Sequence, residues 1–320
     1  MVVVLNAAFG AVLATSPQED ATVLGLTMPP GPGGAPVGER FATTVYRDYA
    51  GVPPATQPPG AENATLLDRV RARGALRVGY IPDAMPFCYF NREGELVGHD
   101  VQMAHDLAGA LNVSRVEFVP VDRENALDRV NAGGCDIVMT GLVLVSPMME
   151  KARFTAPYMD LHLALVTRDE RTGAFEDLDA VARTEGLRIA VAGDTDYDRA
   201  AAALFPRATI VPLEDPEQFF DRAGADALLT TAETGTPLTL LHPFFAVAAV
   251  QYSGASAASS VYALARDCDD ASLLFVDYWL AMEERSGALE AKYDYWVLGK
   301  ETGRRAPRWS VIRDVLHWVG

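Results

Sequence analysis

The alternation of short apolar strands with amphipathic helices, from about residue 66 to residue 299, is the feature that most restricts the fold of this chain. Leu76–Tyr80 and Asp136–Thr140 are nearly continuous apolar runs of the kind found in buried parallel strands. Between them, apolar residues repeat at helical spacing at Val101, Ala104, Leu107, Ala108 and Leu111. The alternation predicts an α/β fold with helices on both faces of its sheets. Ligands of such sheets bind beyond the carboxyl ends of the strands.

The length of 320 residues favours about two domains. Residues 15–64 are rich in Pro, Gly, Ala and Thr, which predicts a linker or wrapping arm, so the folded unit should begin near Thr65. The apolar stretch Val2–Ala14 is too short to span a bilayer and lacks a basic flank. It is either a packed N-terminal segment or the end of a signal or membrane helix.

The last segment, residues 300–320, predicts an amphipathic tail helix. Trp309, Ile312, Leu316 and Val319 share one helical face. That face either packs on its own domain or docks on a partner.

Charge and motifs exclude several classes of function. The formal net charge of -16 argues against nucleic-acid partners. Cys88, Cys135 and Cys268 are far apart, and no CxxC or HExxH pattern occurs, so we expect no metal site. No P-loop, dinucleotide fingerprint or GxSxG motif is present, so we expect no cofactor.

Four blocks of sequence carry a family resemblance, namely 76–111, 130–170, 225–241 and 260–299. They resemble the bacterial extracellular solute-binding proteins of family 3, the amino-acid-type periplasmic binding proteins. The resemblance implies a type II fold with two lobes, each a mixed sheet flanked by helices, joined by two hinge strands. The implied division is an arm over 1–64, lobe 1 over 65–167 plus 252–299, and lobe 2 over 168–251.

Two further blocks, 232–244 and 307–319, resemble soluble binding domains attached to cation:dicarboxylate symporter-type membrane proteins. This second resemblance implies a membrane transporter as partner. It also implies a periplasmic or other extracytoplasmic location, with a membrane tether supplied by the apolar start of the chain.

The family holds an amino acid with an arginine on the α-carboxylate and an aspartate on the α-ammonium. Here Met148 stands where the arginine would be, and Thr231 stands near the aspartate position. Because a thioether cannot replace a bidentate guanidinium, the ligand is left open. Either other groups hold a different small polar molecule, or the cleft has lost binding.

Residues after the first strand are the first candidate replacements. Tyr80 ends that strand, and Asp83, Phe87 and Tyr89 follow it. Aromatic side chains there could cover a ligand and the carboxylate could hold an amine, although Phe87 has simple core packing as its alternative. Arg123, before the next helix, is either a carboxylate clamp or a solvated arginine.

Other candidates follow later strands. Thr140 and Gly141 end the buried strand, where glycine allows close backbone approach or a tight turn. Thr195 and Asp196 open a lobe 2 helix and either hold a ligand or cap the helix. Glu233 is either a cleft carboxylate or a favourable charge at a helix start.

Three hypotheses of function remain. We expect a solute-binding module for a small molecule that serves a membrane transporter, without enzymatic activity. The alternatives are an enzyme that resembles cyclohexadienyl dehydratases, with Glu233 or Asp83 as general acid, and a sensory or structural domain with a vestigial cleft.

Overall fold

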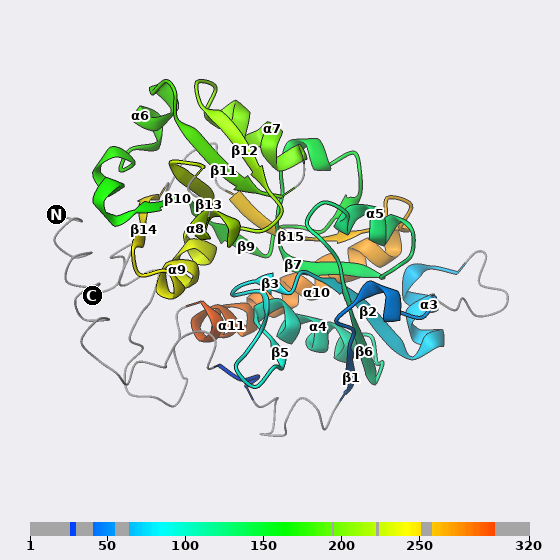
Figure 1. Ribbon diagram of the computed structural model, residues 1–320. Helices are drawn as coiled ribbons and strands as arrows, with labels where there is room; N and C mark the ends of the chain where they lie inside the picture. The colour runs from blue at the N-terminus through cyan, green and yellow to red at the C-terminus, as the bar shows by residue number, and fades with distance from the viewer. Residues whose placement is uncertain are drawn as a thin grey trace.

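Two α/β lobes make up the part of the chain that the computed structural model describes, residues 26–29, 41–54, 64–193, 195–221, 224–250 and 258–297 (Figure 1). A seven-stranded sheet forms lobe 1 and a five-stranded sheet forms lobe 2. The α/β fold predicted from the alternation and the two lobes implied by the family resemblance are therefore confirmed. In Figure 1 the smaller sheet lies above the larger one.

The strands of lobe 1 follow the order β1-β6-β2-β7-β15-β8, and β9 pairs with β15. Their bounds are β1 Ala42–Val45, β2 Ala75–Tyr80, β6 Arg115–Pro120, β7 Ile137–Val143, β8 Arg153–Phe154, β9 Met159–Leu161 and β15 Ala258–Leu264. The first four in that order run parallel, whereas β15 is antiparallel to its neighbours. Every residue of β2 is buried, as expected for a strand covered on both faces.

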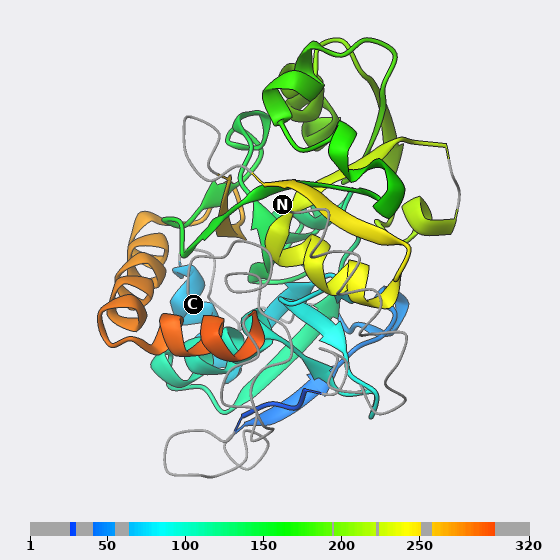
Figure 2. The same cartoon turned by 90° about the vertical axis from the view of Figure 1, so that its left-hand side faces the viewer.

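Helices flank this sheet: α3 Leu66–Arg73, α4 His99–Ala110, α5 Ala126–Asn131, α10 Asp270–Arg285 and α11 Ala288–Trp296. The helix α3 follows its N-cap Thr65, near the predicted start of the folded unit, and ends at Gly74 in the left-handed conformation. All five residues of the predicted apolar face are buried, four in α4 and the fifth, Leu111, at its C-cap. Figure 2 shows α10 and α11, in orange and red, meeting at an angle on one flank of lobe 1.

Smaller elements line the edge of lobe 1. A three-stranded sheet consists of β3 Asp83–Ala84, β4 Cys88–Phe90 and β5 Leu96–Val97, and the 3-10 turns are η2 Tyr49–Gly51 and η4 Ser146–Met148. The turn η4 follows β7 and carries the position at which the family resemblance implied an arginine.

Lobe 2 has the strand order β12-β11-β13-β10-β14. Its strands are β10 Leu163–Arg168, β11 Arg188–Ala192, β12 Thr209–Leu213, β13 Ala227–Thr231 and β14 Phe245–Val250. Its helices are η5 Asp169–Ala174, α6 Leu178–Arg183, α7 Thr195–Leu204, α8 Gln218–Asp221 and α9 Ala232–Leu241. Three strands are parallel, and β10 pairs antiparallel with both β13 and β14.

Two boundaries differ from those implied by the sequence. The family resemblance assigns residues 163–167 to lobe 1, but β10 begins at Leu163 and pairs within the lobe 2 sheet. The predicted arm over 1–64 also contributes β1, which pairs in register with β6. Residues 1–25 and the tail over 300–320 lie outside the described residues.

Candidate functional site between the lobes

The carboxyl ends of the parallel strands of both lobes lie where the lobes meet, which is the place expected for a ligand in α/β sheets. Helix α7, which follows β11, contacts lobe 1 directly: the Tyr197 hydroxyl donates to the Val143 carbonyl at 2.8 Å. The Lys151 ammonium forms an ion pair with the Asp196 carboxylate. The lobes are therefore closed on one another.

Met148 and Thr231, at the positions where the family resemblance implied a ligand clamp, both contact other parts of the protein. Met148 is 2% exposed, and Tyr197 packs against the apolar cluster that contains it. Thr231 is the N-cap of α9 and accepts from the Thr234 amide at 3.3 Å. An apolar, covered surface thus replaces the carboxylate clamp, and a helix cap replaces the ammonium partner.

The start of α7 was predicted either to hold a ligand or to cap the helix. Thr195 is the first residue of α7. Asp196 is 1% exposed and pairs with Lys151 across the lobes and with Arg199 of its own helix at 3.1 Å. In the closed lobes, Asp196 is therefore an interlobe contact.

Glu233 is fully buried and does not face open space. Its Oε1 lies 2.7 Å from His162 Nδ1, and its Oε2 accepts from the His162 backbone N–H at 3.2 Å. Because His162 lies between β9 and β10, Glu233 braces the point at which the chain crosses between the lobes. Burial, followed by the charge of Glu233, raises the pKa of Tyr293 beside it.

Three aromatic candidates lie in the core. Tyr80 is fully buried, and its hydroxyl donates to the Tyr46 carbonyl at 2.7 Å. Phe87 is 2% exposed, so its core-packing alternative is correct. Tyr89 is 2% exposed and meets Trp296 edge to face, with ring centroids 6.3 Å apart. All three side chains therefore point into the protein interior in the closed lobes, and a role for them in ligand binding stays a prediction.

Thr140 and Gly141 support lobe 1 from beneath the site. The Thr140 hydroxyl accepts from the Ile81 amide at 3.0 Å. The Gly141 amide donates to Asp100 Oδ2 at 2.6 Å, and Gly141 has φ +67. Asp100 is a fully buried acceptor that also accepts hydrogen bonds from the hydroxyls of Tyr158 and Tyr262.

Asp83 and Arg123 are the candidates that the structure brings together. Arg123 Nη2 lies 3.1 Å from Asp83 Oδ1, and both side chains are partly exposed. From lobe 2, Asp215 makes a side-chain hydrogen bond with Asp83. Two carboxyl groups from opposite lobes therefore lie near one guanidinium, which forms its ion pair with Asp83.

The ionisation of Asp215 reflects this arrangement. Burial, then the hydrogen bond and the negative charge of Asp83, raise the pKa of Asp215 to about 6, although the positive charge of Arg123 opposes the change. Sequence reasoning missed Asp215. Its place just after β12, at the carboxyl end of a lobe 2 strand, was the signal that could have found it.

Neither a metal site nor a membrane-spanning helix is found within the described residues. No group of three His, Cys, Asp or Glu side chains is placed to hold a metal ion there. In that same part of the chain, no helix combines the length and apolar character needed to cross a membrane.

Comparisons with known proteins agree with this architecture. The chain is 29% identical over 234 residues to the cyclohexadienyl dehydratase of Pseudomonas aeruginosa, covering 72% of this chain and 85% of that protein. It is 25% identical over 133 residues to the L-cystine-binding protein TcyJ of Escherichia coli, covering 42% of this chain and 48% of that protein.

Among solved structures, the ancestral amino acid-binding protein AncCDT-1, described as a precursor of cyclohexadienyl dehydratase, superposes with a TM-score of 0.63. It shares 26% identity with this chain, and the match covers 73% of this chain and all of that structure. The family model of bacterial extracellular solute-binding proteins, family 3, matches residues 76–299. The chain therefore belongs to family 3 of the bacterial extracellular solute-binding proteins.

Proposed function

We propose that this protein captures a small amino-acid-like solute between its lobes, with Asp83, Arg123 and Asp215 as its polar contacts. The observation that carries the proposal is the meeting of these side chains from both lobes, with the pKa of Asp215 raised to about 6. A ligand ammonium between the two carboxylates would relieve their repulsion. A ligand carboxylate would pair with the guanidinium.

Binding at this place would favour the closed form, because the ligand would touch both lobes only when they meet. A ligand shifts a conformational equilibrium by its difference in affinity for the two states. The direct contacts of Tyr197 and Lys151 with the opposite lobe already hold the lobes together, so the ligand adds to an existing closure.

Family membership supports a role in solute uptake. We propose that the protein delivers its solute to a membrane transporter, or regulates one, in the periplasm or another extracytoplasmic compartment. The proposal of a symporter-type transporter as partner rests on the resemblance of residues 232–244 and 307–319. The second of these segments lies outside the described residues. We propose binding without chemical turnover.

A thermal-shift screen tests this function. Amino acids, amines, dicarboxylates and sugars are each added to the wild-type protein and to Arg123→Gln, with Arg266→Gln as an exposed lobe 1 control. An amino-acid-like ligand at 100 times its Kd should stabilise the wild type by about 2.7 kcal/mol by mass action. The shift should shrink in Arg123→Gln and persist in the control. No shift with any compound would support a vestigial cleft.

A second candidate is a dehydratase, which the likeness to cyclohexadienyl dehydratase and the near-neutral pKa of Asp215 favour. Asp215 or Asp83 would then donate a proton to the departing hydroxyl of a carboxylated substrate held by Arg123. Consumption of prephenate or arogenate by the wild type, lost in Asp215→Asn, would establish this alternative over simple binding.

A further inference from the structure

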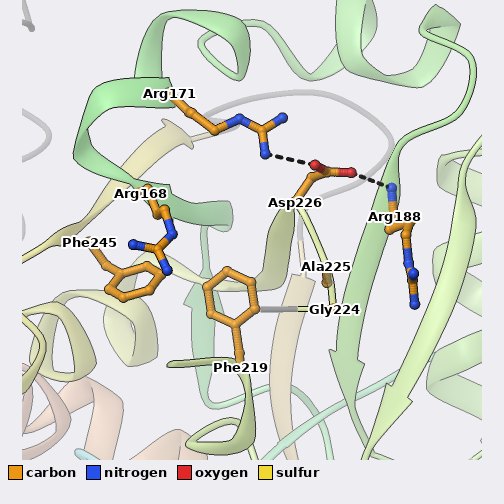
Figure 3. A pocket seen from close by; sticks show the side chains of 8 residues that line it. All are labelled: Arg168, Arg171, Arg188, Phe219, Gly224, Ala225, Asp226 and Phe245. Atoms are coloured by element: carbon orange, nitrogen blue, oxygen red, sulfur yellow. Dashed lines mark hydrogen bonds and ion pairs between the residues drawn. The ribbon is translucent and has the colours of Figure 1, made fainter. Parts of the chain in front are cut away.

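A cavity lies in lobe 2, and none of the interlobe residues Asp83, Arg123 and Asp215 lines it (Figure 3). Its volume is about 270 Å³. Three arginines, one aspartate, two phenylalanines and two small residues line it: Arg168, Arg171, Arg188, Asp226, Phe219, Phe245, Gly224 and Ala225. None of these residues was a candidate from the sequence.

The cavity lies at the edge of the lobe 2 sheet opposite to the interlobe site. Strand β11 begins at Arg188 beside the cavity and ends at Ala192, just before the helix α7 that contacts lobe 1. Strand β10 runs the other way, from the interlobe crossing to Arg168. At about 3.3 Å per residue, these strands place Arg168 and Arg188 roughly 13 Å or more from the interlobe ends of β10 and β11. The Phe219 wall is nearer, because α8 begins three residues after Asp215.

Asp226 fixes one wall of the cavity and is fully engaged. Its Oδ1 accepts from Arg171 Nη1 at 2.7 Å, and its Oδ2 accepts from the backbone N–H of Arg188 at 2.8 Å. Burial is the largest single effect and raises the pKa of Asp226, but the hydrogen bonds from Arg171 and from the Arg188 amide, together with the charges of both arginines, outweigh it and hold the pKa below its ordinary value. The carboxylate therefore stays charged and positions the Arg171 guanidinium.

Positive charge exceeds negative charge around the cavity. Three arginines and one aspartate line it, which leaves two positive charges, although the whole chain has a net charge of -16. Arg168 and Arg171 point toward the two rings, whereas the Arg188 side chain points away from them (Figure 3). Within the described part of the chain, neither the Arg168 nor the Arg188 guanidinium has a carboxylate at ion-pair distance. Such an excess in an acidic protein is a local feature suited to an anion.

The remaining wall is aromatic. Phe219 is 4% exposed, and its ring centroid lies 5.5 Å from that of Phe245. The Arg168 guanidinium carbon lies 5.2 Å from the Phe245 ring centroid, so this charge is held beside the apolar wall. Figure 3 shows Arg168 between the two rings and Arg171 above them.

We propose that this cavity binds a small aromatic carboxylate at a site independent of the interlobe cleft. The carboxylate pairs with the guanidinium groups of Arg168 and Arg171, and the flat apolar body lies against Phe219 and Phe245. A cavity of about 270 Å³ accepts a single ring with one acidic group. The positive charge of the arginines favours an anionic ligand, and the two phenylalanine rings favour a ligand with a flat apolar ring.

Calorimetric titration of the wild-type protein with benzoate, benzamide and acetate tests the proposal. Benzoate should bind with a Kd of about 1 mM or tighter, whereas benzamide and acetate should each bind at least about tenfold more weakly. Arg168→Gln should weaken benzoate binding by about tenfold, because it removes one charge from the clamp. Arg168 is exposed, and its replacement leaves the Arg171–Asp226 pair intact, so the variant should fold.

Two control variants show whether benzoate binds in this cavity and nowhere else on the protein. Arg183→Gln removes an exposed lobe 2 arginine that does not line the cavity, and it should leave benzoate binding unchanged. Arg123→Gln alters the interlobe site and should also leave it unchanged. The proposal is overturned if benzoate does not bind, if benzamide binds equally well, or if Arg168→Gln binds benzoate like the wild type.

Discussion

Asp215→Asn should stabilise the protein at neutral pH. In the folded chain the pKa of Asp215 is raised from 3.8 to about 6, by burial first and then by Asp83. A pKa shift of this size corresponds to a free energy of about 3 kcal/mol for a fully buried group. Because Asp215 is only partly buried, solvent screening reduces the expected effect to about 1 kcal/mol. Asparagine carries no charge and can still donate a hydrogen bond to Asp83.

The sign of the effect depends on pH. A raised folded-state pKa means that the folded protein holds this proton more tightly than the unfolded chain does. The cost of the charged carboxylate is therefore absent below about pH 4, grows as the pH rises from about 4 to about 6, and is fully present above about pH 6. The asparagine variant should match the wild type at pH 4 and exceed its stability at pH 8.

Urea unfolding from pH 4 to pH 8 measures the difference in free energy of unfolding between Asp215→Asn and the wild type. A gain of 1 kcal/mol should also raise the Tm by roughly 2–4 °C in a protein of this size. Glu214→Gln is the matched control, because Glu214 is the exposed neighbour in sequence and should not show this dependence. Equal stability of Asp215→Asn and the wild type at pH 8 would refute the paired-carboxyl interpretation.

Further predictions concern the packing that supports the site. Gly141→Ala should cost about 2–4 kcal/mol in urea unfolding, because its Cβ would lie 2.2 Å from the Phe87 ring and its φ is +67. Gly133→Ala, with φ +73 but open space around it, should cost only about 1 kcal/mol, and equal costs would contradict the clash. Tyr197→Phe removes the hydroxyl that bonds across the lobes and should lower the free energy of unfolding by about 1 kcal/mol; an unchanged value would mean that this bond does not stabilise closure. The three buried thiols should react with a thiol reagent at pH 8 only when the chain unfolds, because burial raises the pKa of each, and rapid labelling of the native protein would contradict their burial.

The fold was predictable because its signals are local and repeated. The run Asp136–Thr140 reads as a buried strand by composition alone, and β7 contains most of it. The edge strand β1 was missed because its four residues lie next to a Pro- and Gly-rich stretch. Only its pairing with β6, more than 70 residues away, identifies it as part of lobe 1.

The candidate site was less predictable, because side-chain direction at a strand end depends on tertiary packing. Tyr80 and Tyr89 lie near the correct edge of the sheet, yet both turn into the core. The partner of Glu233 is His162, which is 71 residues away, and no local pattern links the two. Asp83 and Arg123 were identified from their places after lobe 1 strands.

Calorimetric titration of an amino-acid ligand against variants of each lobe tests most directly whether the two lobes share one binding site. Arg123→Gln changes the lobe 1 contact and Asp215→Asn changes the lobe 2 contact, while both proteins should stay folded. Each variant should bind the ligand at least about tenfold more weakly than the wild type, since each removes one charged contact. Affinity that is unchanged in either variant would contradict a ligand held by both lobes.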